Sequence, residues 1–384
     1  MKARTKDPEY QICRKTVMDT SDPHIKFDAD GVSNHVHDFE KLSKLHWFPN
    51  EIGEKILRRR VQMIKARSRG AEYDCILGLS GGLDSSYMLH KLVVSYGLRP
   101  LVFHVDGGWN TDTAVHNIEA LVDGLSLDLI TEVIDWDEMR EFQLAMFMAG
   151  VPHLDIPQDM AFISVLYKFA QKYDIKTILN GGNFSTESVL MPLDFLYWGS
   201  DLVHVRDILN KHSGYSFKRY PFTNIWHHKF YLRFIKKVDV FKPLNLLRYE
   251  QQAAISELQS IYNWRPYRQK HFESRFTRFF EGYWLPTRFN YDMRRNQFSS
   301  LILTGQMSRE DALTKLNEPP LEENEIARDK EFIAAKLEIS LSELEDLHCL
   351  PKKFYWDYKN RSRLFAFGEK TLDILVGARR GGAI

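Results

Sequence analysis

A glycine-rich turn between an apolar run and a helical pattern does most to decide how this chain can fold. The turn has the sequence Leu79-Ser80-Gly81-Gly82-Leu83-Asp84-Ser85-Ser86. Glycines let a backbone turn sharply and approach an anion closely, and a helix N-terminus supplies free N–H groups. An ordinary strand-to-helix turn is the alternative, but strand, turn and helix all agree with an anion site. We therefore predict a phosphate site formed by Ser80, Gly81, Gly82, Ser85 and Ser86.

Asp84 places a carboxylate in the same turn. A carboxylate would repel a bare phosphate, but it suits a site in which Mg²⁺ is shared with the phosphates. No lysine follows the glycines, so the turn is not a Walker A loop. We expect Asp84 to bind Mg²⁺ and to take part in catalysis.

Short apolar runs alternate with helical stretches in the first half of the chain. This alternation predicts an α/β fold, with a parallel sheet whose faces are covered by helices. Right-handed crossovers would place the C-terminal ends of all strands at one edge, where ligands usually bind. The predicted strands are 73–79, 101–105, 127–134 and 177–179, and the predicted helices are 85–96, 113–124, 137–149 and 159–173.

Two further strand ends carry residues suited to a nucleotide site. Asp106 follows the second strand, whereas Gly182 and Asn183 follow the fourth, with Glu187 shortly after. Small residues would allow close approach of the backbone to a nucleotide, and Glu187 could serve the metal or the substrate. A strand-ending turn and a solvated helical glutamate are the alternatives.

The composition excludes several classes of protein. The chain has 52 Lys and Arg against 51 Asp and Glu, which excludes a globally basic nucleic-acid coat and an acidic solvating chain. Hydrophobic residues make up 44%, enough for a sizeable core. The longest apolar stretch, 144–151, is too short for a membrane span, and the polar start is unlike a secretory signal. The chain has only three cysteines, Cys13, Cys75 and Cys349. So small a number argues against a disulfide framework and favours a location in the reducing cytoplasm.

The distribution of apolar, turn-forming and basic residues also predicts further helices and a division of the chain into three parts. Single helices are expected over 40–68 and 301–317, the second with a capping signal at Ser308, and Ser340 begins a similar signal before another short helix. The three parts are an N-terminal arm (1–45), the α/β domain (46–250) and a mostly helical region for substrate and partners (251–384).

Aromatic and basic residues are interleaved between residues 265 and 295. Eight Arg or Lys stand there against three acidic residues (273, 281 and 292), at positions 265, 268, 270, 275, 278, 288, 294 and 295. Such a patch suits an anionic ligand, and the aromatic rings could stack on a base. A helix whose arginine stems pack on aromatic rings is the alternative.

The glycine-rich turn resembles the signature of the PP-loop ATP pyrophosphatases, a superfamily that includes NAD synthetase and several tRNA-modifying enzymes. The resemblance implies an adenine nucleotide alpha hydrolase-like, Rossmann-like domain. It also implies that the turn binds pyrophosphate and that ATP is cleaved between its α and β phosphates.

A second string, Lys270-His271-Phe272-Glu273-Ser274-Arg275-Phe276-Thr277-Arg278, resembles the signature of the N-acetyl sugar amidotransferases. These WbpG-type enzymes act in bacterial surface-polysaccharide synthesis. Residues 155–159, 242–245 and 299–313 match the same family, and the resemblance runs from Asp19 to about Lys352.

What this resemblance implies is a specific reaction with ATP and Mg²⁺. An N-acetyl group of a nucleotide-linked sugar, a UDP-diacetamido uronic acid, would be adenylated and then converted by ammonia into an acetamidino group for lipopolysaccharide O-antigen. His271, Glu273 and Arg275 are candidates for substrate contact or proton transfer. A buried charged cluster that only stabilises the protein is the alternative for these three.

The chain departs from this family at its start, where two Cys-x-x-Cys pairs usually resemble a structural zinc site. The corresponding positions hold Cys13 and Thr16, then Ser33 and Val36. One thiolate cannot hold a tetrahedral zinc ion alone. His24, His35 and His37 could in principle rebuild a site, but we expect no zinc and an arm held by packing.

No cysteine has the sequence context of a glutaminase nucleophile. The resemblance implies a separate class-I-type glutaminase subunit that supplies ammonia, together with a cyclase-like subunit in some systems. We expect neither a membrane nor a nucleic acid as partner.

Two other functions stay open at the level of sequence. A PP-loop tRNA-modifying enzyme could use the basic and aromatic region to hold RNA, with salt-sensitive binding as its mark. A non-catalytic nucleotide-binding subunit could organise a glycan assembly, although the intact Ser-Gly-Gly-x-Asp-Ser turn argues against this.

Overall fold

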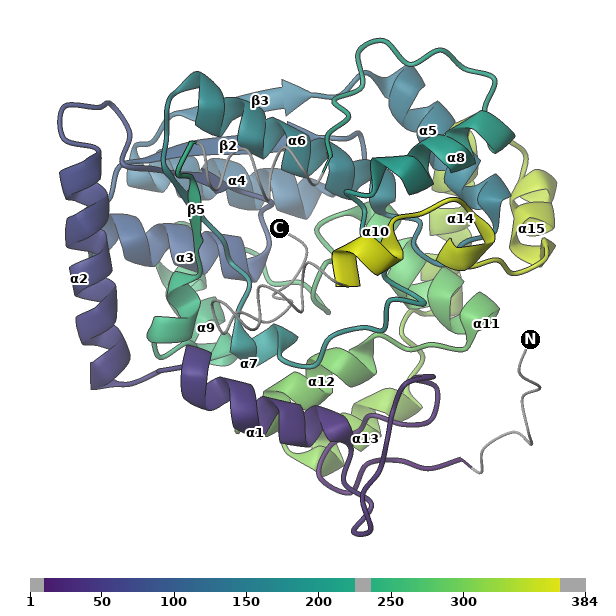
Figure 1. Ribbon diagram of the computed structural model, residues 1–384, viewed down its shortest axis with the longest axis horizontal. Coiled ribbons are helices and arrows are strands. Elements are labelled where there is room, and N and C mark those ends of the chain that lie inside the picture. Colours follow the sequence, from purple (N-terminus) through teal and green to yellow (C-terminus); the bar gives the residue numbers. More distant parts are fainter. Residues whose placement is uncertain (1–9, 225–235, 367–384) are drawn as a thin grey trace.

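The first half of the chain is built around a parallel sheet, whose labelled strands β2, β3 and β5 lie in the upper left part of Figure 1. The structure, a computed structural model, describes residues 10–224 and 236–366. Neighbouring strands are parallel throughout the order β3-β2-β1-β4-β5. This confirms the predicted α/β fold, although β5 was not predicted, because its residues are only partly buried and form no apolar run like that of β4. The strands are β1 (Cys75–Gly78), β2 (Pro100–Asp106), β3 (Leu129–Val133), β4 (Thr177–Leu179) and β5 (Asp239–Phe241).

The strand order changes direction at β1. From β1 the chain runs through α3 (Leu83–Val94) to β2 and through α4 (Asp112–Leu125) to β3, and β4 then lies on the other side of β1. In open parallel sheets, ligands bind in the crevice beyond the C-terminal ends of the strands at such a switch point. The glycine-rich turn follows β1, so the topology places it at this crevice.

Alternating side chains bury both faces of the sheet. Ile76 packs in one hydrophobic core, whereas Cys75 and Leu77 pack in the other, and all three are fully buried. The Cys75 core is completed by α2 (Glu51–Arg67), α3, α4 and α9 (Gln251–Tyr262). The Ile76 core is completed by α5 (Trp136–Ala149) and α6 (Ile156–Lys172), together with α8 (Leu202–His212).

The C-terminal helices pack on the Ile76 core. Phe276, Trp284, Leu285 and Ile333 all belong to it, so the C-terminal region and the sheet share one hydrophobic interior. The division of the chain at residues 45 and 250 stays a prediction. The helices of this region are α10 (Arg275–Phe279), the π-helix η3 (Phe280–Trp284), α11 (Leu285–Phe289), α12 (Arg294–Leu303), α13 (Arg309–Asn317), α14 (Glu323–Leu337) and α15 (Leu341–Cys349).

Two stretches predicted as single helices are each divided, so those predictions were wrong. Residues 40–68 contain the end of α1 (Asn34–His46) and all of α2. Pro49 lies between them, and the Asn50 side chain caps α2 by accepting hydrogen bonds from backbone N–H groups of its first turn. Residues 301–317 contain the end of α12 and all of α13, because Gly305 ends α12 with a φ of +74°.

Both predicted serine caps are present. Ser308 accepts a hydrogen bond from the Asp311 N–H at the start of α13. Ser340 and Glu343 cap each other reciprocally at the start of α15. The local signals for where these helices begin were therefore correct, even where the predicted length was wrong.

The N-terminal arm lies against the C-terminal helices. Isolated antiparallel bridges join Ile12 to Asp19 and Phe27 to Ser33. Arg309 donates to the carbonyl oxygens of Cys13 and Thr16 at 3.0–3.2 Å. The arm is therefore held by contacts with α13, a segment about 300 positions away, and not by local structure alone.

The four positions that correspond to the family's cysteines come together in the arm. Cys13, Thr16, Ser33 and Val36 are all buried, and the Ser33 N–H donates to Cys13 Sγ at 3.3 Å. Within residues 10–224 and 236–366, no group of three or more His, Cys, Asp or Glu could hold a metal ion. Each of the three histidines pairs with a different carboxylate: His24 with Asp194, His35 with Asp22 and His37 with Asp28.

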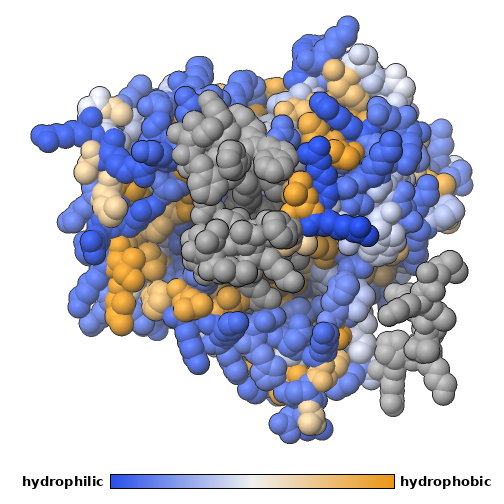
Figure 2. All heavy atoms as spheres, viewed as in Figure 1, coloured by the Kyte–Doolittle hydropathy of each residue, from blue (hydrophilic) through white to orange (hydrophobic). Residues whose placement is uncertain are grey.

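Every helix in the part of the chain that the structure describes is too short or too polar to cross a lipid bilayer. Figure 2 shows hydrophilic side chains over most of one face, with apolar side chains gathered mainly in the region of α2 and α9. The exposed apolar residues of these two helices include Ile52, Ile56 and Ile261.

Candidate functional site

The glycine-rich turn leads directly from β1 into α3. Gly82 is the N-cap of α3, and Gly81 has a φ of +79°. A Cβ atom on Gly81 would lie 2.6 Å from the Ala114 carbonyl oxygen, and one on Gly82 would lie 2.6 Å from Glu273 Oε1. Glycine is required at Gly81, whereas a Cβ on Gly82 would have to displace the flexible end of the Glu273 side chain. No side chain caps the start of α3, which leaves backbone N–H groups there for an anion.

Replacing Gly81 with alanine is expected to destabilise the protein by about 2 kcal/mol, from the positive φ and the contact with the Ala114 carbonyl oxygen. Urea unfolding would measure this loss. Gly70→Ala is the matched control, because Gly70 has a φ of +84° with nothing within 4 Å of an added Cβ. If both variants lose the same stability, the close contact at Gly81 contributes nothing.

Asp84 lies in the first turn of α3 and accepts hydrogen bonds from three distant segments. The Tyr249 hydroxyl donates to Asp84 Oδ1, and Lys270 Nζ lies 2.8 Å from Asp84 Oδ2. Thr186 Oγ1 is 3.4 Å from the same Oδ2 atom. Asp84 thus joins the glycine-rich turn to the loop after β4 and to the Lys270–Arg278 string.

Lys270 is the centre of this cluster. Its ammonium nitrogen lies 2.8 Å from Asp84, 2.6 Å from Glu187 and 2.8 Å from Thr186 Oγ1. Burial alone would lower the pKa of Lys270, but the two carboxylates outweigh burial and raise it. Conversely, burial would raise the pKa of Glu187, but Lys270 outweighs it and lowers that pKa. Two carboxylates that share one cation form a donor set suited to Mg²⁺.

The loop after β4 lies beside the glycine-rich turn. A Cβ on Gly181 would be 3.5 Å from the Asp84 side chain. A Cβ on Gly182 would be 3.1 Å from Glu187 Oε2 and 3.1 Å from Lys242 Nζ, so Gly182 leaves room for both charged groups. Asn183 caps the short helix α7 (Phe184–Glu187), which carries Thr186 and Glu187. The structure therefore brings Gly182, Asn183 and Glu187 to the turn.

The serine hydroxyls and Asp106 have different surroundings. Ser80 and Ser85 face each other at 3.2 Å within the turn. Ser86 instead accepts from the indole N–H of Trp264 in the core, so its hydroxyl does not serve the turn as predicted. Asp106 lies at the same edge, but its carboxylate accepts from Gly108 N–H and Asn110. These contacts favour the strand-ending turn for Asp106.

The turn after β2 positions the second signature. Thr111 N–H donates to the Glu273 carbonyl at 3.0 Å, and Arg275 N–H donates to the Trp109 carbonyl at 2.8 Å. This short pairing places the Glu273 side chain over the turn, where Ser80 Oγ donates to it at 3.3 Å. Burial raises the pKa of Glu273. Glu273 therefore lies within the candidate site.

His271 is held in an unusual conformation next to Lys270. Its φ is +67°, and its Nδ1 atom lies 2.8 Å from Glu281 Oε1 in the π-helix η3. Strained residues and single π-helical turns cluster at functional sites. Burial would lower the pKa of His271, but Glu281 outweighs it and raises the pKa to about 9. At neutral pH the imidazole is therefore a cation, which can bind an anion or donate a proton.

The stability that the His271–Glu281 pair contributes is expected to depend on pH. Because folding raises the His271 pKa from 6.5 to about 9, this contribution is complete below about pH 6.5 and is lost as pH rises to about 9. Urea unfolding at pH 6.5 and pH 9 would show Glu281→Gln to be more costly at the lower pH. Asp28→Asn, in the exposed pair with His37, should change stability little at either pH. An equal cost for Glu281→Gln at both values would contradict the cationic pair.

Arg275 does not point into the site. Its guanidinium donates to Asp329 at 2.8 Å and to the Arg328 carbonyl at 3.1 Å, and it lies over the Phe332 ring. Arg278 binds the same carboxylate, which is fully buried. These contacts correct the expectation for Arg275, because its charge is taken up by the attachment of α10 to α14.

Most of the predicted basic patch is likewise bound by other groups of the protein. Arg288 and Arg294 are buried and donate to backbone carbonyl groups, and Arg295 pairs with Asp19 in the arm. Arg268 pairs with Glu322 and Glu325. A broad anion-binding patch over 265–295 was therefore the wrong interpretation, and Lys270 is the member that reaches the cluster around Asp84.

Two further segments that resemble the same family, residues 155–159 and 242–245, form hydrogen bonds with residues next to the site. The Ser274 hydroxyl donates to Gln158 at 3.1 Å, and Gln158 donates to Asp155 at 2.6 Å. Burial raises the pKa of Asp155 to about 7. The Asn245 side chain accepts from Phe184 N–H at 2.8 Å and so fixes the start of α7.

Four residues of the cluster were not assigned to it from sequence: Thr186, Lys242, Tyr249 and Lys270. A signal existed for two of them, because Lys242 and Lys270 are the first residues of two strings that matched the family. Thr186 and Tyr249 carried no local signal.

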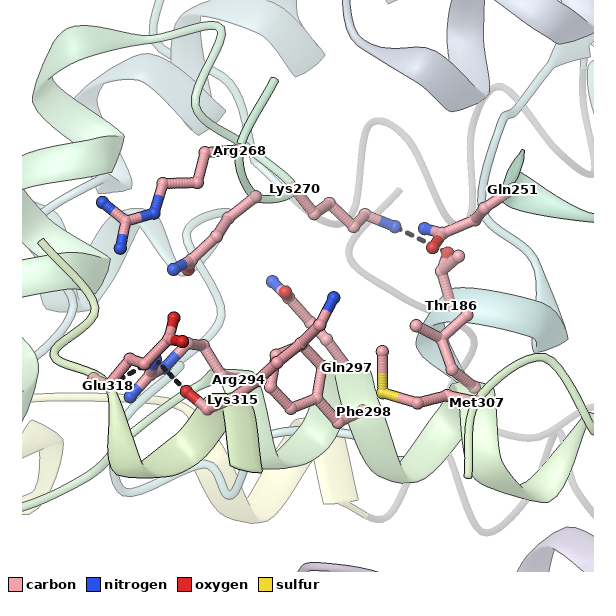
Figure 3. A pocket seen from close by; sticks show the side chains of 12 residues that line it. Thr186, Gln251, Arg268, Lys270, Arg294, Gln297, Phe298, Met307, Lys315 and Glu318 are labelled. Atoms are coloured by element: carbon pink, nitrogen blue, oxygen red, sulfur yellow. Dashed lines mark hydrogen bonds between the residues drawn. The ribbon is translucent and has the colours of Figure 1, made fainter. Parts of the chain in front are cut away.

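A pocket of about 220 Å³ opens next to this cluster. Figure 3 shows that Lys270 reaches from the pocket wall toward Thr186, opposite Gln297 and Phe298 on α12. Four basic side chains and one acidic side chain line it. The lining residues are Thr186, Gln251, Arg268, Gln269, Lys270, Arg294, Gln297, Phe298, Leu301, Met307, Lys315 and Glu318.

The structure has the parallel sheet and the Ser-Gly-Gly-x-Asp-Ser turn between β1 and α3 that the resemblance to the PP-loop ATP pyrophosphatases implies. Residues 273–372 match a family model described as LPS biosynthesis protein WbpG-like, C-terminal domain. The resemblance to the WbpG-type enzymes is thereby confirmed for this part of the chain. Together with the turn, the match supports an ATP-using enzyme of amidotransferase or synthetase type.

Three solved structures are similar to the chain at a low level, each with 15% identity. The NH3-dependent NAD synthetase from Campylobacter jejuni has a TM-score of 0.30 over 71% of this chain and 99% of its own. The NMN synthetase from Francisella tularensis has 0.28 over 58% and 99%. The U34-tRNA thiolase NcsA from Methanococcus maripaludis has 0.30 over 67% and 79%. A search of curated proteins gave no match.

Proposed function

We propose that this chain is an ATP-dependent amidotransferase of lipopolysaccharide O-antigen synthesis. It adenylates an N-acetyl group of a nucleotide-linked sugar, a UDP-diacetamido uronic acid, and adds ammonia to give an acetamidino group. The observation that carries this proposal is the meeting of the glycine-rich turn with Lys270 and Glu273 of the sugar-amidotransferase signature, around Asp84. The WbpG-like match over residues 273–372 supports the choice of reaction.

The chemistry explains why ATP is needed. An amide carbon is a weak electrophile and its oxygen is a poor leaving group. In the first step the amide oxygen attacks the α-phosphorus of ATP, the α–β bond breaks, and pyrophosphate leaves. In the second step ammonia attacks the imidate carbon, the carbon–oxygen bond breaks, AMP leaves with that oxygen and one ammonia proton, and an amidinium remains.

The residues present fit these steps. The open N–H groups at the start of α3 would hold the pyrophosphate part, and Lys242 adds a cation beside it. Asp84 and Glu187 would hold Mg²⁺, which when bound neutralises charge on the departing pyrophosphate. The cationic His271 and the carboxylate of Glu273 lie next to Lys270 and the turn, where an anionic substrate group and the incoming ammonia need partners.

We place the source of ammonia in a separate class-I-type glutaminase, with a cyclase-like subunit as a further partner. Cys13 and Cys75 are buried, and burial raises the pKa of the Cys75 thiol, which makes it a poor nucleophile. The pure chain should therefore turn over with ammonium and not with glutamine. Turnover with glutamine alone would contradict a separate glutaminase.

The test of the reaction is product analysis with Mg²⁺-ATP, excess ammonium and a panel of nucleotide-linked N-acetyl sugars. We expect AMP, pyrophosphate and a sugar one mass unit lighter, because an amide oxygen is replaced by an amidine N–H. AMP without a changed sugar would reject the sugar substrate, and tRNA would then be tested next. ATP binding without AMP formation with any sugar would favour a non-catalytic subunit.

A further inference from the structure

Lys270 belongs to two sites at once. Its ammonium group is bound by Asp84, Glu187 and Thr186, and its side chain also lines the pocket of about 220 Å³. The side chain is 14% exposed, so most of its surface is covered while it holds the two carboxylates. The same lysine is therefore shared by the carboxylate cluster and the pocket (Figure 3).

The pocket has the chemistry of an anion site. Arg268, Lys270, Arg294 and Lys315 line it, against Glu318 as the one acidic residue among its lining residues. Arg294 is already bound by Asp292 and by two carbonyl groups, so its charge is balanced, whereas Lys270 would add a positive charge to the pocket once it left Asp84 and Glu187. A volume of about 220 Å³ is below that of pockets for drug-sized ligands and suits one ring-sized group.

We propose that Lys270 couples the two sites. In the free protein its ammonium group neutralises Asp84 and Glu187. When a metal–nucleotide complex occupies these carboxylates, Lys270 turns into the pocket and pairs with an anionic group of the second substrate. This inference rests on the proposed function, and it adds an order to it, in which the nucleotide binds first.

Elementary electrostatics supports this exchange. A divalent cation and an ammonium group repel each other at short range, so they compete for the same carboxylate oxygens. Lysine has a flexible four-carbon stem and a compact charge, which lets it change partners without moving the backbone. Either a carboxylate or a diphosphate could be its new partner, since both are anions.

Calorimetric titration would measure the coupling directly. The probes are Mn²⁺ with α,β-methylene-ATP, and then UDP-glucuronate or UDP-glucose. With the natural chain, the metal–nucleotide should tighten binding of UDP-glucuronate about tenfold. If only UDP-glucuronate gains, the partner is a carboxylate, whereas an equal gain for UDP-glucose identifies the diphosphate.

Lys270→Met is the decisive variant. It should bind Mn²⁺ with α,β-methylene-ATP as tightly as the natural chain or more tightly, because nothing then competes for Asp84 and Glu187. The tenfold coupling should fall to less than twofold. Arg268→Met is the matched control: Arg268 lines the same pocket but contacts Glu322 and Glu325, so its loss should weaken UDP-sugar binding and leave the coupling intact. Lys270→Gln serves if the methionine variant melts early.

Two outcomes would overturn the coupling. One is a loss of nucleotide affinity of tenfold or more in Lys270→Met, which would make Lys270 a permanent phosphate ligand. The other is unchanged coupling in that variant. If the natural chain binds no nucleotide at all, the proposed function falls together with the coupling, so the two failures are distinguishable.

Discussion

Replacing Asp84 with asparagine is expected to lower sugar-dependent AMP formation roughly a thousandfold. Asparagine keeps the shape of the side chain, and its amide oxygen can still accept from the Tyr249 hydroxyl. The change removes one of the two carboxylates that would hold the metal ion at the phosphates. Lys270 keeps Glu187 as a partner, so the fold should be retained.

The measurement is the rate of AMP release from labelled ATP, with thermal unfolding of the same samples. Asp106→Asn is the matched control, because the Asp106 carboxylate serves the turn that follows β2. We expect that variant to lose less than about tenfold. An Asp84→Asn protein within about tenfold of the natural rate would remove Asp84 from the reaction.

Asp329→Asn is expected to destabilise the protein by about 3 kcal/mol, because it leaves two arginines without their shared carboxylate in a buried setting. Asp329 is fully buried, and Arg275 and Arg278 are less than one third exposed. The loss should be seen as a lower urea midpoint. Glu322→Gln, which removes an exposed partner of Arg268, should change stability by less than about 1 kcal/mol.

Variants of Arg275 and Asp329 distinguish a structural role of Arg275 from a catalytic one. Arg275→Lys should lower stability, but the AMP rate per folded molecule should stay within about threefold of the natural rate. A stable Arg275→Lys protein that forms no AMP would restore Arg275 to the catalytic set. Unchanged stability of Asp329→Asn would show that the ion pairs do not hold α14 in place.

The sequence was most informative where a function depends on residues next to one another. The anion site proposed for the turn from Ser80 to Ser85 depends on backbone N–H groups and two glycines, so it is contained in a few consecutive residues. Three of the four predicted strands, β1, β2 and β4, were found for a similar reason, since each is a short apolar run that is mainly buried. The predicted length of helices was less reliable, because Pro49 and Gly305 interrupt patterns that otherwise continue.

Side chains were harder to assign than elements. Arg275 and Lys270 belong to one string and carry the same charge, yet one binds Asp329 and the other binds Asp84. Lys270 comes just before His271, whose φ is positive, whereas Arg275 is the first residue of α10. The backbone between them therefore directs the two side chains to different partners. The prediction of an anion-binding patch over residues 265–295 was wrong for this reason. A count of charged residues does not say which of them pair with one another in the folded protein.

The sequence by itself therefore determined the α/β class, the position of the glycine-rich turn and the family of the C-terminal region, because all three depend on contiguous residues. Only the tertiary structure decided which groups surround Asp84. Thr186, Tyr249 and Lys270 are 102, 165 and 186 positions from it and meet it through the order of the parallel strands. Such contacts depend on the order of the strands and on the packing of α7 and α9. Neither of these produces a recognisable pattern of residues in the sequence.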